Sequence, residues 1–117
     1  MITIYGIPNC NTVKKALDWL KNHQVEYTFH DFKKKGITID KLGEWATKVG
    51  WEALVNKRGT TWKQLPIEVQ QGIQNKDAAF ELILQKTSVT KRPVLESNRG
   101  ILLGFDEASY AAYFAKK

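Results

Sequence analysis

Residues 1–29, MITIYGIPNCNTVKKALDWLKNHQVEYTF, decide the fold of this 117-residue chain. The run from Ile2 to Tyr5 is β-prone and is ended by a glycine and a Pro-Asn pair. Apolar residues then recur at the i, i+3, i+4, i+7 spacing of an amphipathic helix, at Val13, Ala16, Leu17 and Leu20. Alternation of apolar and polar residues from Val25 to Phe29 indicates a second strand. A strand, a helix and a strand within about thirty residues form a βαβ unit, so we expect parallel strands joined by a right-handed crossover.

The middle of the chain carries mostly helical patterns. Apolar side chains recur there at helical spacing, and Asp77 is a candidate N-cap residue. The sequence predicts the following segments: helices over 40–49, 66–75 and 77–86, a short turn over 51–56, and loops over 33–35 (three lysines) and 56–64 (NKRGTTWKQ).

The last third returns to strands. Two apolar runs, Pro93–Glu96 and Ile101–Leu103, flank Ser-Asn-Arg-Gly, a good hairpin turn. Asp106 is expected to cap a terminal helix. The order is therefore β-α-β, a helical insertion, then β-β-α, which is an α/β fold of the thioredoxin-like, glutaredoxin type. We expect one domain over 1–117, with the core at about 1–32 and 90–117 and the insertion at about 37–88.

Composition excludes several classes of protein. Hydrophobic residues make up 43% and charged residues 26% of the chain, and no apolar run approaches the ~20 residues of a membrane span. The N-terminus lacks the basic region of a signal peptide, and a single cysteine gives no disulfide framework, so we expect a cytoplasmic protein, as a monomer, with no membrane partner. The net charge of +6 favours anionic partners, but the basic residues form no stripe with interleaved aromatics, which argues against nucleic acid. Cys10, His23 and His30 lack the spacing of a metal site.

Cys10 is the candidate reactive group. It lies between the first strand and the first helix, where unpaired backbone N–H groups and the helix dipole favour a thiolate. Asn9 or Asn11 is expected to cap this helix, and Lys14 and Lys15 add positive charge one turn on. The alternative is a buried, inert cysteine. Position 13 of the chain is a valine, so there is no CxxC pair, and any disulfide formed at Cys10 must be resolved by an external thiol.

Two arginines and a proline are further candidates. Arg92-Pro93 opens the third strand, and Arg58 lies in the polar segment 56–64, where clustered donors suit an oxyanion. The alternative is that Arg92 is a solvated surface charge and that the segment around Arg58 is an ordinary exposed connection. The four tryptophans mostly occupy core positions, and Trp62 is the one expected near a cleft.

Four stretches together resemble the arsenate reductase family, in its ArsC/Spx/YffB branch, through almost the whole chain. They are IYGIPNCNTVKKALDWL, LVNKRGTTWKQLP, KRPVLE and LLGFDE. The second stretch and the absence of a second cysteine resemble the YffB-like members more than Spx.

The resemblance implies that Cys10 is the nucleophile, flanked by Arg58 and Arg92, and that Pro93 is the cis-proline of the thioredoxin fold. It implies a thiol co-substrate, glutathione or a small redox protein, bound near these residues and near Asn9, Asn11 and Thr12, with no tightly bound cofactor. Glutathione-coupled arsenate reductases carry a third arginine near the C-terminus, and the matching stretch here, Leu103–Asp106, has none.

Three functions follow as hypotheses. The first is a glutathione-dependent monothiol oxidoreductase, in which Cys10 forms a mixed disulfide with a small-molecule or protein substrate. The second is arsenate reduction with two arginines. The third is a non-catalytic, Spx-like module that binds RNA polymerase.

Overall fold

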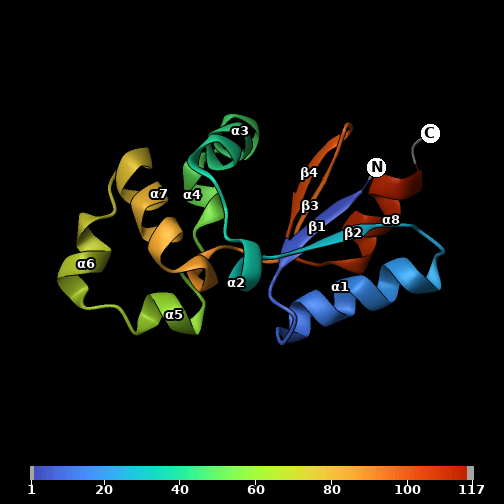
Figure 1. The fold of residues 1–117 in the computed structure, drawn as a ribbon, viewed down its shortest axis with the longest axis horizontal. Helices are drawn as coiled ribbons and strands as arrows, with labels where there is room; N and C mark the ends of the chain where they lie inside the picture. The colour runs from blue at the N-terminus through green and yellow to red at the C-terminus, as the bar shows by residue number, and fades with distance from the viewer. Residues whose placement is uncertain (1, 116–117) are drawn as a thin grey trace. The chain divides into compact units, whose positions relative to one another are not determined.

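The computed structural model describes residues 2–115, and Figure 1 shows it as a ribbon. Its elements in chain order are β1 (Thr3–Gly6), α1 (Asn11–Asn22), β2 (Thr28–Asp31), α2 (Phe32–Lys35), α3 (Ile39–Val49), α4 (Trp51–Leu54), α5 (Thr60–Lys63), α6 (Ile67–Gly72), α7 (Lys76–Gln85), the 3₁₀ turn η1 (Thr87–Val89), β3 (Val94–Ser97), β4 (Gly100–Leu103) and α8 (Glu107–Ala115).

The chain divides into two compact units. The first, here called the sheet unit, contains the residues up to Asp31 and those from Arg92 onward. The second, here called the helical unit, is Phe32–Lys91, where the sequence predicts a helical insertion. The fold is thus mixed α/β, with β-α-β before the helices and β-β-α after them, which is the thioredoxin-like arrangement that the sequence predicts.

Four strands form the sheet in the order β2-β1-β3-β4. β1 and β2 are parallel, with Ile4 opposite Phe29, so the predicted βαβ unit is confirmed. β3 is antiparallel to β1, with Tyr5 opposite Val94, and β4 is antiparallel to β3. The second strand begins three residues later than predicted, at Thr28, because the residues before it serve as the turn that leaves α1.

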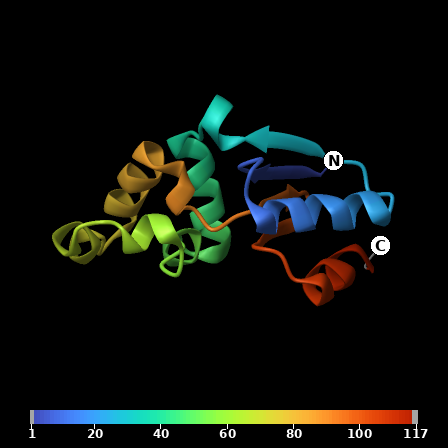
Figure 2. The ribbon, with the colours of Figure 1, turned by 90° about the horizontal axis from the view of Figure 1, so that it is seen from below.

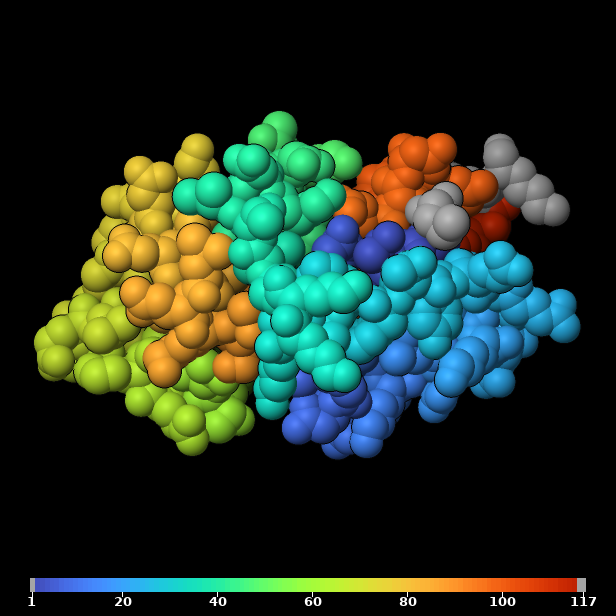
Figure 3. Space-filling view, viewed as in Figure 1, coloured from blue at the N-terminus to red at the C-terminus, as the bar shows by residue number. Residues whose placement is uncertain are grey.

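α1 and α8 lie on the same side of the sheet (Figure 2). Their apolar faces and one face of the central strands form a single core cluster, in which strands and helices contribute buried side chains as follows: Ile4, Ala16, Trp19, Leu20, Leu95 and Tyr110. The opposite side of α1 is polar and exposed, and it covers part of the face seen in Figure 3. The amphipathic pattern of residues 13–20 therefore sets which side of α1 meets the sheet.

The close approach of α1 to β1 depends on a glycine. A Cβ built at Gly6 would lie 2.8 Å from Cγ2 of Val13, which is fully buried in the first turns of α1. That separation is shorter than carbon atoms tolerate, so any larger residue must push the start of α1 away from the strand. The same start of the helix carries Cys10.

We expect Gly6→Ala to lower the free energy of unfolding by about 1–3 kcal/mol, because the added methyl group overpacks a filled site. Urea denaturation measures this change. Gly43→Ala is the matched control, since nothing lies within 4 Å of a Cβ at that position in α3. There the same substitution should raise stability by about 0.5–1 kcal/mol through helix propensity. Equal effects at the two positions would contradict the packing argument.

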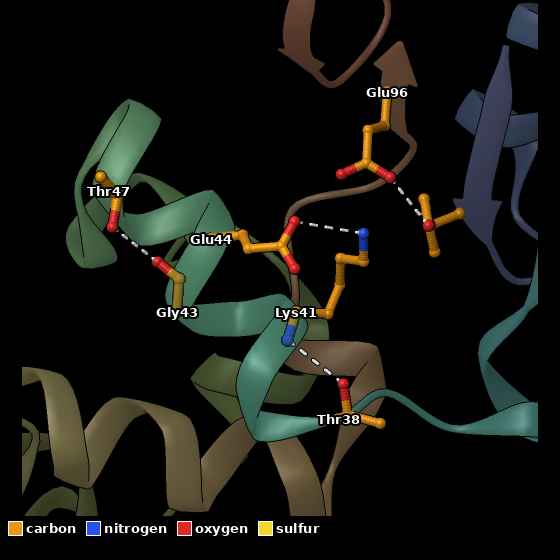
Figure 4. Close-up of polar contacts among 7 residues, drawn as sticks. Thr38, Lys41, Gly43, Glu44, Thr47 and Glu96 are labelled. Atoms are coloured by element: carbon orange, nitrogen blue, oxygen red, sulfur yellow. Dashed lines mark hydrogen bonds and ion pairs between the residues drawn. The ribbon is translucent and has the colours of Figure 1, made fainter. Parts of the chain in front are cut away.

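In the helical unit, α3, α4 and α7 pack on one another, with Leu42, Trp45, Leu54 and Ile83 buried among its side chains. Thr38 caps α3, because its Oγ1 accepts a hydrogen bond from the Lys41 amide at 3.2 Å (Figure 4). A short antiparallel bridge joins Val55, which follows α4, to Thr90, near the end of the unit.

Three local predictions in this unit are wrong. Segment 56–64 is not all loop, because α5 forms within it, tied to η1 by a hydrogen bond from Thr61 Oγ1 to Ser88 Oγ at 2.9 Å. The lysine run lies in α2 instead of a loop, although the lysines are exposed as expected. α7 is capped by Asn75, which accepts from the Ala78 amide at 2.9 Å, so Asp77 is inside the helix and not its cap.

Over the described residues, no helix combines the length and the apolar character that a membrane span requires.

Candidate functional site: the thiol at the start of α1

The loop after β1 places Cys10 at the N-cap position of α1. The Cys10 amide donates to the Ile7 carbonyl at 3.2 Å, and the Cys10 carbonyl accepts from the Lys14 amide at 3.0 Å. Its backbone is extended, with φ −93° and ψ 126°. The expectation that Asn9 or Asn11 caps the helix is wrong: Asn9 lies in the preceding turn and Asn11 is the first helical residue. Cys10 is the N-cap residue because the turn after β1 includes Asn9, so the helix begins one residue later than an Asn9 cap requires.

The surroundings of Cys10 lower the pKa of its thiol. Partial burial acts in the opposite direction and is the largest single effect, since it disfavours the thiolate. Together, the Val13 amide, the hydrogen bond and charge of Arg92, and the Thr12 amide outweigh it. Cys10 makes no side-chain capping hydrogen bond of normal geometry, so the two amides act on the sulfur through their N–H dipoles.

Sheet pairing is what brings Arg92 to Cys10. Val94 pairs with Tyr5 near the end of β1, and Arg92 precedes Val94 by two residues. Because β1 and β3 are antiparallel, the end of β1 lies beside the start of β3. The chain that leaves β1 forms the loop that carries Cys10, so this loop lies next to Arg92. The predicted lysines, Lys14 and Lys15, are exposed on α1, and Arg92 is the cation that lowers the Cys10 pKa.

The peptide bond between Arg92 and Pro93 is cis, as the family resemblance implies. Pro93 is buried, and its carbonyl accepts a hydrogen bond from the Gly104 amide at 2.8 Å. The residues beside the thiol along the chain, Asn9, Asn11 and Thr12, are all exposed and therefore accessible to a ligand.

The second predicted arginine, Arg58, belongs to the helical unit. Its side chain is exposed, and its amide donates to Asn56 Oδ1 at 3.2 Å. Lys57, beside it, places its ammonium 5.4 Å from the ring centre of Trp62. Trp62 is 8% exposed, so it is a packing residue with a cation over its ring. The role of Arg58 as a basic residue that flanks Cys10 stays a prediction.

The two histidines serve aromatic contacts. His23 stacks on Trp19 at a centroid distance of 3.8 Å and its Nδ1 lies 2.9 Å from the Trp19 carbonyl oxygen. The His30 ring lies 4.8 Å from that of Tyr5. Within residues 2–115, no group of three or more His, Cys, Asp or Glu side chains is placed to hold a metal ion.

A cleft of about 640 Å³ begins at Thr12, two residues after Cys10, and no direct signal in the sequence indicates it. We call it the α1–α8 cleft. One side is a stripe of α1, and the other is the corner between β4 and α8, with these lining residues: Thr12, Lys15, Asp18, Trp19, Asn22, Phe105, Asp106 and Glu107. The only available signal was the spacing of polar residues along the edge of the apolar stripe of α1. Trp19 lines this cleft and Trp62 does not, so the expectation that Trp62 lies near a cleft stays a prediction.

A four-stranded sheet with a lone cysteine at the N-terminus of its first helix, next to a cis-proline loop, defines a thioredoxin-like protein. The family profile of the "ArsC family" matches residues 5–113, and the chain belongs to that family.

Several relatives cover nearly the whole chain. An uncharacterized protein of Haemophilus influenzae is 42% identical over 98% of this chain and all of its own length. The solved structure of a protein named YFFB is 42% identical, with a TM-score of 0.90 over 97% of this chain and 98% of that one. An arsenate reductase (ArsC) related protein from Brucella melitensis is 46% identical, with a TM-score of 0.77 over 97% of this chain and 93% of its own.

More distant relatives share less sequence. A global transcriptional regulator Spx, from Lactiplantibacillus plantarum, is 23% identical over the full length of this chain and 89% of its own. An arsenate reductase from Vibrio cholerae is 14% identical with a TM-score of 0.76 over 97% of this chain and 95% of its own, which shows a shared fold.

Proposed function

We propose that this protein is a thiol-dependent reductase that works through a mixed disulfide at Cys10. The observation that carries the proposal is the lowered pKa of Cys10 at the N-terminus of α1, produced in part by Arg92. The thiolate is the form that attacks sulfur electrophiles, and a lowered pKa increases the fraction of thiolate at a given pH. Similarity to arsenate reductase-related proteins supports the same class of chemistry.

The proposed reaction is thiol–disulfide exchange. The Cys10 thiolate attacks one sulfur of a substrate disulfide, a new S–S bond forms to Cys10, and the other half leaves as a thiolate that takes a proton from water. A glutathione thiolate then attacks the substrate sulfur of this mixed disulfide and expels the Cys10 thiolate. A second cycle on the glutathionylated product releases the second substrate thiol and yields glutathione disulfide, so two glutathione molecules supply both electrons.

Arg92 is proposed to have two parts in this cycle. Its charge stabilises the Cys10 thiolate before attack, and its planar donor group binds an anionic portion of the substrate or of glutathione. Arg58 is proposed as a second anion-binding residue on the strength of the family resemblance. The exposed residues Asn9, Asn11 and Thr12, together with the backbone before Pro93, are proposed to contact the thiol ligand.

The direct test is the pH dependence of Cys10 alkylation by iodoacetamide. Because the thiolate is the reactive form, the rate follows the titration of Cys10, and we expect its midpoint below the ordinary thiol value of about 8.5. Mass spectrometry of the single cysteine gives the rate at each pH. A midpoint at or above 8.5 would remove the activated thiolate and with it the proposed function.

Arsenate reduction is a second candidate, favoured by a cation beside the thiol and by the neighbours that carry that name. An assay with arsenate, glutathione and glutaredoxin separates it from disulfide exchange. Arsenite formation above the level of a Cys10→Ser control supports it, and exchange activity without arsenite formation eliminates it.

A further inference from the structure

The α1–α8 cleft is joined to the thiol through the first turn of α1. Thr12 lines the cleft, and the amide of the same residue is one of the groups that lower the pKa of Cys10. Cys10 itself does not line the cleft, which begins two residues along the chain from the thiol, so the cleft is the nearest cavity on α1 for the part of a substrate beyond its sulfur. Its volume, about 640 Å³, lies within the range typical of ligand pockets.

The lining of the cleft is negative although the chain as a whole is positive. It contains three carboxylates, of Asp18, Asp106 and Glu107, and one ammonium, of Lys15, so its net charge is −2 against +6 for the chain. Over residues 2–115, none of the three carboxylates forms an ion pair. Asp106 accepts both the amide and the hydroxyl of Ser109 at 2.9 Å on one oxygen, Oδ2. These bonds lower the pKa of Asp106, so its carboxyl stays ionised.

Aromatic side chains supply the rest of the wall. Phe105 is half-buried, and Trp19 is 9% exposed and held between neighbouring rings. Tyr110, which is buried, packs edge-on against both, at centroid distances of 4.8 Å from Phe105 and 5.5 Å from Trp19, so both rings of the wall rest on the core. An aromatic wall with a carboxylate rim suits an organic cation, whose methylene groups pack on the rings while its charge meets the carboxylates.

The length of the cleft indicates a peptide. From Thr12 to Asn22 the stripe spans ten residues of helix, which is about 15 Å. Asp18 lies eight residues beyond Cys10, or about 12 Å along the helix, and an extended peptide covers that distance in about three to four residues. A small disulfide would fill only the end nearest the thiol.

We propose that the α1–α8 cleft selects protein disulfides in which a lysine or arginine lies about three residues from the attacked cysteine. The basic side chain binds between Asp18 and Glu107, against Phe105, while the cysteine sulfur meets Cys10. This inference rests on the proposed function and adds the class of substrate to it. It also runs against the simplest electrostatic expectation, because the net charge of +6 and Arg92 both favour acidic peptides.

The test uses three peptides, acetyl-Cys-Gly-Gly-X-amide with X as Arg, Ala or Glu, each joined through its cysteine to thionitrobenzoate. Attack by Cys10 forms the peptide mixed disulfide and releases thionitrobenzoate, whose colour gives the rate. We expect the Arg peptide to react about fivefold faster than the Ala peptide at low salt, and the Glu peptide to react slowest. The order Glu, Ala, Arg would overturn the proposal and leave Cys10 chemistry intact.

The variant for this test removes two charges from the cleft, Asp18→Asn with Glu107→Gln. We expect it to lose the preference for the Arg peptide and to keep the rate with the Ala peptide. Glu26→Gln with Glu68→Gln is the matched control, since it changes the net charge equally at exposed positions outside the cleft and should keep the preference. Asp106 is left in place because it caps α8.

A binding measurement separates failure of the cleft from failure of the thiol. The Cys10→Ser chain is titrated with the Arg and Ala peptides carrying serine in place of cysteine, and the Trp19 indole N–H is followed by NMR. Saturable shifts with the Arg peptide at several-fold lower concentration than with the Ala peptide support the cleft even if Cys10 reacts with none of the disulfides. Equal or absent shifts overturn it.

Discussion

A Cys10→Ser chain is expected to lose its reductase activity down to the uncatalysed rate, a fall of at least about a thousandfold. Serine keeps the size and position of the side chain but has no ionisable thiol at physiological pH, so no mixed disulfide forms. A coupled assay with glutathione, glutathione reductase and NADPH measures the loss, with a small disulfide as substrate. This is the largest effect that we predict for a single substitution.

The N-cap position of Cys10 makes this substitution unusually clean. Serine is a preferred N-cap residue, whereas the thiol makes no capping hydrogen bond of normal geometry. We therefore expect the free energy of unfolding to stay the same or rise, by up to about 1 kcal/mol, so the loss of activity does not come from unfolding. Activity retained by Cys10→Ser would show that the chemistry occurs elsewhere in the chain.

Replacing Arg92 with methionine is expected to have the second largest effect. The hydrogen bond and the charge of Arg92 both favour the Cys10 thiolate, while burial opposes it, so their removal raises the thiol pKa. For each unit by which a thiol pKa rises above the working pH, the thiolate fraction falls about tenfold and its nucleophilicity rises about threefold. The net loss in the rate of attack at neutral pH is about threefold per unit, and loss of anion binding adds to it.

Arg92→Lys distinguishes charge from geometry. Lysine keeps the positive charge but lacks the planar fork of donors, so it should restore part of the pKa effect and little of the affinity for an anionic substrate. Alkylation against pH reads the first quantity, and the KM of the reductase assay reads the second. An unchanged alkylation midpoint in Arg92→Met would show that the amides at the start of α1 act alone.

The same titration has a consequence for stability. The pKa of Cys10 is lower in the folded chain than the ordinary value of the unfolded one, so the folded state favours the thiolate. This contribution to the free energy of unfolding, which depends on pH and is absent in Cys10→Ser, is fully present above the unfolded pKa and is lost as the pH falls through the folded pKa. Arg92→Met should reduce this pH dependence, which urea denaturation at several pH values measures.

The sequence alone determined the order of the main elements and the position of the single cysteine at the start of the first helix. Spacing of apolar residues in 13–20 predicted α1 and its buried face, and the hairpin and the Asp106 cap followed from turn and cap chemistry. These features depend on neighbours in sequence, which is why they could be predicted. The start of α7 was predicted less well: Asp77 was expected as the N-cap residue, and Asn75 caps the helix instead. Helix starts two residues apart differ little in free energy, so local patterns do not define the exact terminal residue.

The tertiary structure decided the environment of the thiol that opens α1. Residues 1–29 contain Cys10 and the helix that begins at it, but the cation that lowers its pKa comes from Arg92, eighty-two positions away in sequence and adjacent only through the pairing of β1 with β3. The α1–α8 cleft likewise exists only because two helices share one side of the sheet. Sheet pairing and helix packing join residues whose separation along the chain carries no periodic signal, so no local pattern could show them.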